Sequence, residues 1–182
     1  MFSSHLFVPL KKVLSFEKKI KKCFSFVFFS LIRTFARVMT FEVKDGALSE
    51  GQKSFSGLSF LVRDHEMQEV EVPERCAVPF IHAMLGLRDL DVGVISLDGE
   101  PMTAYSASSL RRLMGYVPRT LVMPDQRERQ YSQTELRRIL LDEVSSSRRA
   151  VVIVDGLLNS EERDACQRMA DDGAAVIVVR EE

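Results

Sequence analysis

The segment VEVPERCAVPFIHAMLGL, residues 70–87, decides how the rest of the chain is interpreted. It follows a strand-like segment and opens an apolar, helix-like run, which is the place of a phosphate-binding loop in nucleotide-binding α/β folds. Such a loop needs glycines, so that backbone N–H groups close around the anion, and a lysine that reaches the outer phosphates. Residues 70–85 contain no glycine, and the whole segment contains no lysine. The position is that of a nucleotide loop, but the chemistry opposes nucleotide binding.

Four residues of this segment oppose a bound phosphate directly. Pro73 and Pro79 each lack a backbone N–H donor. Glu71 and Glu74 bring negative charge to the place where phosphate charge would lie. We therefore interpret these four positions as those of a degenerate phosphate loop.

The flanking segments, residues 39–66 and 84–118, carry three ordered motifs: LGL, D-x-G-x-I-x-L-D-G and LRR-x-x-GYVP. In this order and spacing they resemble the ATP-binding domain of ABC transporters, and the resemblance runs from Met39 to the C-terminus. It implies an α/β fold, a truncated ABC-type P-loop ATPase-like domain. An antiparallel β portion, at about residues 40–75, is expected beside a mainly parallel sheet with flanking helices.

Two positions that contact nucleotide or Mg²⁺ in the family are substituted here. Glu50 stands where the family has an aromatic residue that stacks on adenine, and a carboxylate has no π-face. Arg119, after GYVP, stands where the family has a glutamine that helps to hold Mg²⁺ and the attacking water. A guanidinium accepts no hydrogen bond and ligates no cation, so this position is a degenerate Q-loop.

The segment YSQTELRR, residues 131–138, resembles the family signature LSGGQ and the basic helix that follows it. Only 35 residues separate Arg119 from Asp155, where family members have several dozen more. The deletion is therefore expected to remove the front of the helical subdomain and to leave the signature helix. Ser132 is retained, while Glu135 replaces the glutamine and the glycines are absent. We therefore interpret Ser132 and Glu135 as the remnant positions of the signature.

The signature helix also has a purely structural explanation. Ser132 and Glu135 form an S-x-x-E capping box, and we interpret Ser132 as a helix cap rather than a γ-phosphate contact. The spacing of the apolar residues predicts one buried face. That face comprises Leu136, Ile139, Leu140 and Val144.

The apolar run at residues 151–154 is typical of a buried parallel strand, and it ends in Asp155. This resembles the Walker B segment, in which such an aspartate at a strand end can ligate Mg²⁺. Gly156 follows, where the family has its general-base glutamate, so no carboxylate is placed to polarise water. The last strand, residues 175–179, ends where the family has a γ-phosphate-sensing histidine, and none is present. We predict no catalytic residue and no metal site, with Asp155 an isolated remnant.

Residues 1–38 differ sharply in composition from the rest. They hold eight basic residues and one acidic residue, a net charge of +7, and eight of the twelve phenylalanines. Their apolar run, residues 23–32, is about half of the ~20 residues that span a bilayer. We favour translation from Met39, with residues 1–38 an upstream extension. The alternative is a basic helix lying on an anionic membrane surface.

Residues 39–182 form the expected single domain and carry a net charge of −8, which disfavours nucleic-acid binding. Cys23, Cys76 and Cys166 are odd in number and widely spaced, which predicts reduced thiols and an intracellular protein. Ser160 is expected to cap another helix, with Glu161 and Glu162 in its first turn.

The resemblance to ABC ATP-binding domains, together with the substituted nucleotide-contacting positions, implies a catalytically inactive ABC-transporter ATP-binding-like subunit. It would act without a cofactor, as a binding or structural partner of another ABC ATPase subunit or of a membrane permease. It would be cytoplasmic, or peripheral at the inner face of the membrane. The alternative is an ABC transporter ATPase subunit with divergent nucleotide motifs, which would use ATP and Mg²⁺.

Overall fold

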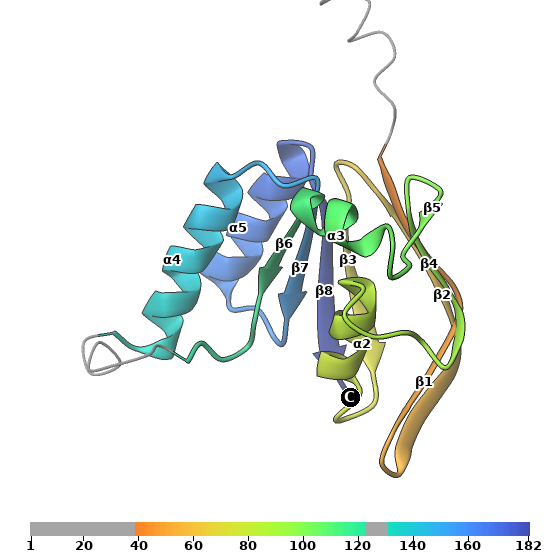
Figure 1. The fold of residues 1–182 in the computed structure, drawn as a ribbon. Coiled ribbons are helices and arrows are strands. Elements are labelled where there is room, and N and C mark those ends of the chain that lie inside the picture. The colour runs from red at the N-terminus through yellow and green to blue at the C-terminus, as the bar shows by residue number, and fades with distance from the viewer. Residues whose placement is uncertain (1–38, 123–130) are drawn as a thin grey trace, which may run out of the picture. The chain divides into compact units, whose positions relative to one another are not determined.

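The computed structural model describes residues 39–122 and 131–182, which form two sheets with helices between and beside them (Figure 1). One sheet is antiparallel, with strand order β2-β1-β4-β5. The other is parallel, with order β3-β8-β7-β6. The antiparallel strands are β1 (Thr40–Glu50), β2 (Lys53–Arg63), β4 (Val92–Leu97) and β5 (Glu100–Pro101). The parallel strands are β3 (Met67–Val72), β6 (Met114–Val117), β7 (Val151–Asp155) and β8 (Ala175–Glu181).

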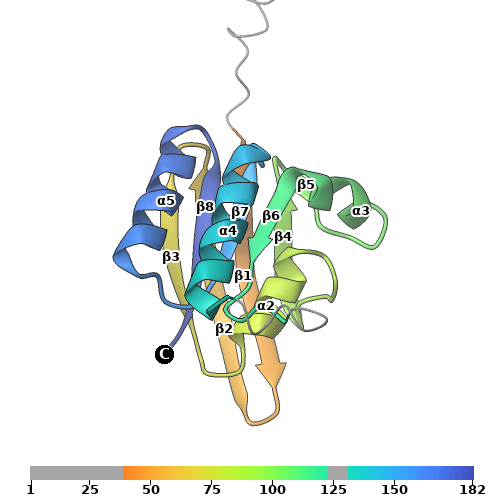
Figure 2. The ribbon, with the colours of Figure 1, turned by 90° about the vertical axis from the view of Figure 1, so that its left-hand side faces the viewer.

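The helices cover both faces of the parallel sheet (Figures 1 and 2). Helix α2 (Ala77–Met84) lies between the two sheets, and α4 (Gln133–Ser146) packs beside α5 (Ser160–Asp171) on the other face. The short helix α3 (Ala107–Leu110) runs into a 3₁₀ turn (Arg111–Leu113) before β6. Strands β7 and β8 are entirely apolar over residues 151–154 and 175–179 because helices bury both of their faces.

The core between the sheets is centred on α2. Phe80 is fully buried and meets Phe55 and Phe60 of β2 in edge-to-face contacts, with ring centroids 5.3 and 6.3 Å apart. The same core includes Ile153 and Ile177 from the parallel sheet. Helix α2 therefore joins the two sheets.

The predicted fold class is confirmed, but the extent of the antiparallel portion was wrong. Residues 67–72 lie in the parallel sheet as β3, with Met67 opposite Val176 of β8. The antiparallel sheet is instead completed by β4 and β5, which follow α2 in the chain: β4 pairs with β1, and β5 pairs with β4. Sequence patterns locate strands but do not show which partners they take.

The predicted buried face of α4 was partly wrong. Ile139 is 47 % exposed, whereas Arg137 is buried together with Leu136, Leu141 and Val144. Arg137 turns inward because the carboxylate of Glu162 on α5 receives its guanidinium.

The start of α5 also differs from the prediction by one residue. Asn159, not Ser160, is the cap: its side chain accepts the backbone N–H of Glu162 at 2.9 Å, and Glu162 returns a bond to the N–H of Asn159. An amide oxygen caps as effectively as a hydroxyl, so the choice between neighbouring residues depends on the local backbone.

The capping box predicted for α4 is present. Ser132 Oγ accepts the backbone N–H of Glu135 at 3.3 Å, and Glu135 Oε2 accepts the N–H of Ser132 at 2.8 Å. The bond from the Ser132 N–H, and a second from the Ser132 hydroxyl to the same carboxylate oxygen at 2.9 Å, lower the pKa of Glu135.

We expect Ser132→Ala to lower the free energy of unfolding by about 0.5–2 kcal/mol, because the backbone N–H of Glu135 loses its acceptor. Urea titration followed by circular dichroism measures the change. Ser146→Ala, in the last turn of the same helix, is the control and should change it by less than about 0.5 kcal/mol. An unchanged midpoint for Ser132→Ala would show that the box does not stabilise the helix.

Within the described residues, no helix combines the length and apolar content that crossing a bilayer requires. Residues 1–38, with their two predicted alternatives, lie outside the described residues, as does Cys23. Cys76 and Cys166 are free thiols buried in the domain.

Candidate functional site

The carboxyl ends of β6, β7 and β8 meet the β3–α2 loop at one edge of the parallel sheet, the lower edge in Figure 1. This is the edge at which open α/β sheets bind ligands. Four residues far apart in the sequence contact one another here, and we call them the edge cluster: Arg75, Arg119, Asp155 and Glu181.

Arg119 is the centre of the edge cluster. Its Nη1 donates to Glu181 Oε2 at 2.8 Å, and its Nη2 lies 3.6 Å from Asp155 Oδ1. Its backbone N–H also donates to Asp155 Oδ2 at 3.4 Å. The hydrogen bond from Arg119 is the main reason that the pKa of Glu181 is lowered. One guanidinium thus holds two carboxylates from the ends of two adjacent strands.

Asp155 is the most buried member of the cluster, with 3 % of its surface exposed. Burial raises the pKa of its carboxyl group, and the attraction of Arg119 only partly offsets this. Its Oδ1 accepts no hydrogen bond from any described residue. Burial, with Asp155 as a second cause, also raises the pKa of the nearby Tyr116 to about 12.

Glu181 links the cluster to the phosphate-loop position. Its Oε1 accepts the backbone N–H of Arg75 at 3.2 Å, while its Oε2 accepts Arg119. Arg75 has φ = +70°, a left-handed conformation, just before α2 begins. A carboxylate of the chain itself therefore takes a backbone donor of this loop.

Gly156 cannot carry a side chain in this geometry. Its φ is +90°, which favours glycine, and a Cβ built there would lie 2.9 Å from Arg119 Nε. The guanidinium of Arg119 therefore occupies the space into which a residue at position 156 would project. A general-base carboxylate at position 156 is incompatible with the observed position of Arg119.

Three of the four predicted phosphate-loop residues have structural roles. Glu71 pairs with Arg180, and the carbonyl of Pro73 accepts the N–H of Cys76 at 2.9 Å in the turn before α2. Pro79 is the third residue of α2, where a helix N–H lacks an intrahelical acceptor in any case. Glu74 is exposed at the edge.

Two other predicted positions lie apart from the edge cluster. Glu50, at the tip of the β1–β2 hairpin, binds Arg88 at 3.0 Å. The side chain of Ser132 contacts Glu135 and, among the described residues, no member of the cluster. Apart from the capping pair Ser132 and Glu135, Arg119 and Asp155 are the predicted site residues that the described structure brings into direct contact.

Arg137 is an important residue that sequence reasoning missed. Its Nε donates to Glu162 Oε1 at 2.8 Å, and its Nη1 donates to the carbonyls of Asp155 at 2.8 Å and Pro118 at 3.1 Å. It therefore joins α4 and α5 to the ends of β6 and β7, directly behind the edge cluster. Its position four residues before Leu141, on the buried face, was the available signal.

Two hollows flank Arg119. One, of about 510 Å³, is lined by Glu74, Arg119, Leu157, Glu181 and Glu182. The other, of about 240 Å³, is lined by Val78, Tyr116, Pro118, Arg119, Thr120 and Asp155. The described residues contain no group of three or more side chains able to hold a metal ion. Asp155 alone, already paired with Arg119, does not fit a Mg²⁺ site.

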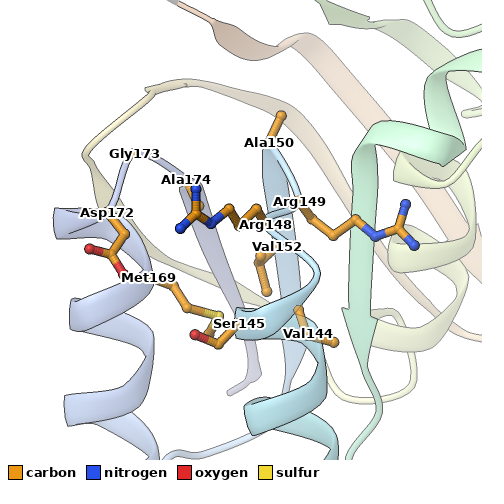
Figure 3. A pocket seen from close by; sticks show the side chains of 10 residues that line it. All are labelled: Val144, Ser145, Arg148, Arg149, Ala150, Val152, Met169, Asp172, Gly173 and Ala174. Carbon is orange, nitrogen blue, oxygen red and sulfur yellow. The ribbon is translucent and has the colours of Figure 1, made fainter.

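A further hollow, of about 400 Å³, lies at the opposite end of the sheet, between the C-termini of α4 and α5 (Figure 3). Arg148 and Asp172 line it, with Val152 and Met169 as apolar walls. The guanidinium of Arg149 points away and binds the carbonyl of Arg112. The helix C-termini oppose an anion at this end, and none of the predicted motifs lies there.

No protein-family model and no curated protein sequence matches the chain. Among solved structures, it is similar to an ATP-binding subunit of an ABC transporter, with a TM-score of 0.62 and 16 % identity over 78 % of this chain and 79 % of that one. It is similar to cbiO1 from Clostridium perfringens, described as part of the ABC transporter complex cbiONQ, with a TM-score of 0.58 and 13 % identity over 78 % of both chains.

A third similar structure is a bacterial Atm1-family ABC exporter with ATP bound, with a TM-score of 0.59 and 12 % identity. The match covers 79 % of this chain and 35 % of the exporter chain. At these identities the comparisons establish the fold alone. The chain has the α/β fold of the ATP-binding subunits of ABC transporters.

Proposed function

We propose that the chain is a catalytically inactive ABC-type subunit, which acts as a binding or structural partner in an ABC system. The observation that carries this proposal is the edge cluster. Arg119 supplies a fixed cation beside Asp155, and Glu181 supplies a fixed anion on the backbone of the β3–α2 loop. The chain's own charges thus take the contacts that Mg²⁺ and phosphate would need.

Opening this site for a nucleotide would be costly. The polyphosphate would have to displace Glu181 from both the Arg75 N–H and the Arg119 guanidinium, which are charge-assisted bonds. It would also approach Glu74 and Glu182, which line the same hollow and repel like charge. A titration with Mg²⁺–ATP tests the proposal, and we expect no saturable binding.

The alternative function, an ATPase with divergent motifs, has one feature in its favour. Asp155 stands at the end of a buried strand, where Mg²⁺ binds in sites of this fold. The ATPase function would require Arg119 to move away from Asp155. It would also require another general base, because Gly156 stands where the family has its catalytic glutamate.

Partners and location follow from the proposed role. The partner would be another ABC ATPase subunit or a membrane permease, since cbiO1 is described as part of a transporter complex. The subunit would work in the cytoplasm or at the inner face of the membrane, with residues 39–182 as its folded domain. If residues 1–38 are translated, their charge of +7 would favour an anionic membrane surface.

We expect Arg119→Met to lower the free energy of unfolding by about 1–2 kcal/mol at neutral pH, because a partly exposed charged hydrogen bond is lost. The pKa of Glu181 is lowered in the fold, so its contribution is complete above the ordinary carboxyl pKa of 4.5. It is lost as the pH falls through the lowered value. The difference between wild type and variant should therefore shrink below about pH 4.

Denaturant titrations from neutral to acidic pH measure this difference. Arg75→Met is the control, since only the backbone of Arg75 contacts Glu181, and it should change the free energy of unfolding by less than about 0.5 kcal/mol. A difference for Arg119→Met that stays constant down to acidic pH would contradict the assigned ion pair.

A further inference from the structure

We propose that the surface around Arg119 binds a basic, partly apolar segment of a partner protein. We call this surface the acidic edge, and define it by Glu74, Val78, Leu157, Glu181 and Glu182 around Arg119. The proposal rests on the proposed function and adds the chemistry of the partner.

The shape of the acidic edge suits an inserted side chain. The two hollows, of about 510 and 240 Å³, lie on either side of Arg119 and both include it in their lining. Together they form a continuous surface from the end of β8, past Arg119, to the first turn of α2.

Apolar side chains stand beside both hollows. Leu157 is 75 % exposed and lines the larger hollow, and Val78 is 44 % exposed and lines the smaller one. Leu157 lies two residues after the end of β7, and Val78 is the second residue of α2, so regular elements position both. Fixed apolar groups among polar ones are typical of protein-binding surfaces.

The charges of the acidic edge select a cationic partner. The side chains of Glu74 and Glu182 make no hydrogen bond or ion pair with any described residue, while Glu181 is already bound to Arg119. With Asp155, four carboxylates line the two hollows against one guanidinium, that of Arg119, so the lining is negative. Anionic ligands are repelled, and lysine or arginine side chains are attracted.

A buried acceptor gives the smaller hollow a specific contact. Asp155 Oδ1 is buried in its wall, where Arg119 Nη2 lies 3.6 Å away, and it accepts no hydrogen bond from any described residue. A buried acceptor without a hydrogen bond lowers the stability of the folded protein, and a donor from a ligand would remove this penalty. An ammonium or guanidinium group of the partner, entering beside Val78, would supply that donor.

The test uses the full chain and a synthetic twelve-residue peptide of alternating lysine and leucine, with binding followed by fluorescence anisotropy. We expect the double variant Glu74→Gln/Glu182→Gln and the single variant Leu157→Ser each to weaken binding by about fivefold or more, the effect of a contact worth about 1 kcal/mol. The matched control, Asp171→Asn/Asp172→Asn, neutralises two carboxylates at the opposite end of the sheet. It should change the affinity by less than about twofold.

The outcomes separate this proposal from the proposed function. Equal weakening by the control variant, or equal binding of a serine–lysine peptide of the same charge, would overturn the acidic edge as a specific surface. Displacement of the lysine–leucine peptide by Mg²⁺–ATP, but not by tripolyphosphate, would overturn the inactive-subunit proposal and leave the docking surface in place. No peptide binding in any variant would overturn the docking surface and leave the inactive-subunit proposal untouched.

Discussion

Replacing Arg137 by alanine is expected to lower the free energy of unfolding by about 3–5 kcal/mol, the cost of breaking a buried ion pair by removing one partner. The carboxylate of Glu162 is buried, and Arg137 Nε is its cationic donor at 2.8 Å. The same substitution removes the donor to the carbonyls of Pro118 and Asp155. The buried groups left unsatisfied therefore come from three elements, and the loss should exceed that of an ordinary hydrogen bond.

Denaturant titration of the full chain measures this effect. Arg138→Ala is the matched control, because it changes the same residue type on the exposed side of the same helix, and it should cost less than about 0.5 kcal/mol. The double variant Arg137→Met/Glu162→Met should recover part of the loss, since it removes both charges. Full recovery would show that neither the two carbonyl bonds nor the cap bond from the Asn159 N–H to Glu162 contributes to stability. A single variant as stable as wild type would refute the buried pair.

Phe80→Ala should lower the free energy of unfolding by a similar amount, about 3–5 kcal/mol, through the cavity that it leaves between the two sheets. Phe80 is fully buried and contacts the rings of Phe55 and Phe60. Because these neighbours are packed around it, they cannot readily move to fill the cavity. Since α2 is the element that joins the sheets, this position tests the whole layered arrangement.

Thermal and urea unfolding of Phe80→Ala would show the loss as a lower midpoint. His82→Ala, two residues further along the same helix and only partly buried, is the control and should cost less than about 1 kcal/mol. If both substitutions cost the same, α2 does not pack as described.

The fold was predictable because its motifs lie in local sequence. The ordered segments before Pro118 and the apolar runs ending at Asp155 and residue 179 predicted the α/β architecture, and the structure confirms it. Strand partners were less predictable. Residues 67–72 joined the parallel sheet because β8 pairs with them from more than a hundred residues away.

The candidate site was predictable only in part. Arg119 and Asp155 were recognised from neighbouring motifs, and the structure places them in contact. Glu181 lies in no recognised motif, and the signature-like segment 131–138 did not single out Arg137. Their roles depend on partners in other elements: the Arg75 N–H for Glu181, and Glu162 for Arg137. An ion pair between distant segments leaves no local pattern, so residue spacing alone did not reveal it.

The acidic edge and the buried Arg137 pair give the site two layers. Behind the edge, Arg137 fixes the ends of β6 and β7 through backbone carbonyls. In front of it, Arg119 joins β7 to β8 through carboxylates. Contacts to the neighbouring strands hold the residues of this site in place. Such a site suits the proposed role as a fixed binding surface better than one in which it opens around a substrate.

The most direct test of the account is calorimetric titration of the full chain with millimolar ATP and Mg²⁺, with tripolyphosphate as the comparison. Any attraction of ATP to the basic residues 1–38 would be shared by tripolyphosphate, whereas a nucleotide site would distinguish the two. We predict no saturable heat that is specific to ATP and no specific rise in melting temperature. Saturable ATP binding that tripolyphosphate does not reproduce, and that Asp155→Asn abolishes, would contradict the inactive-subunit account.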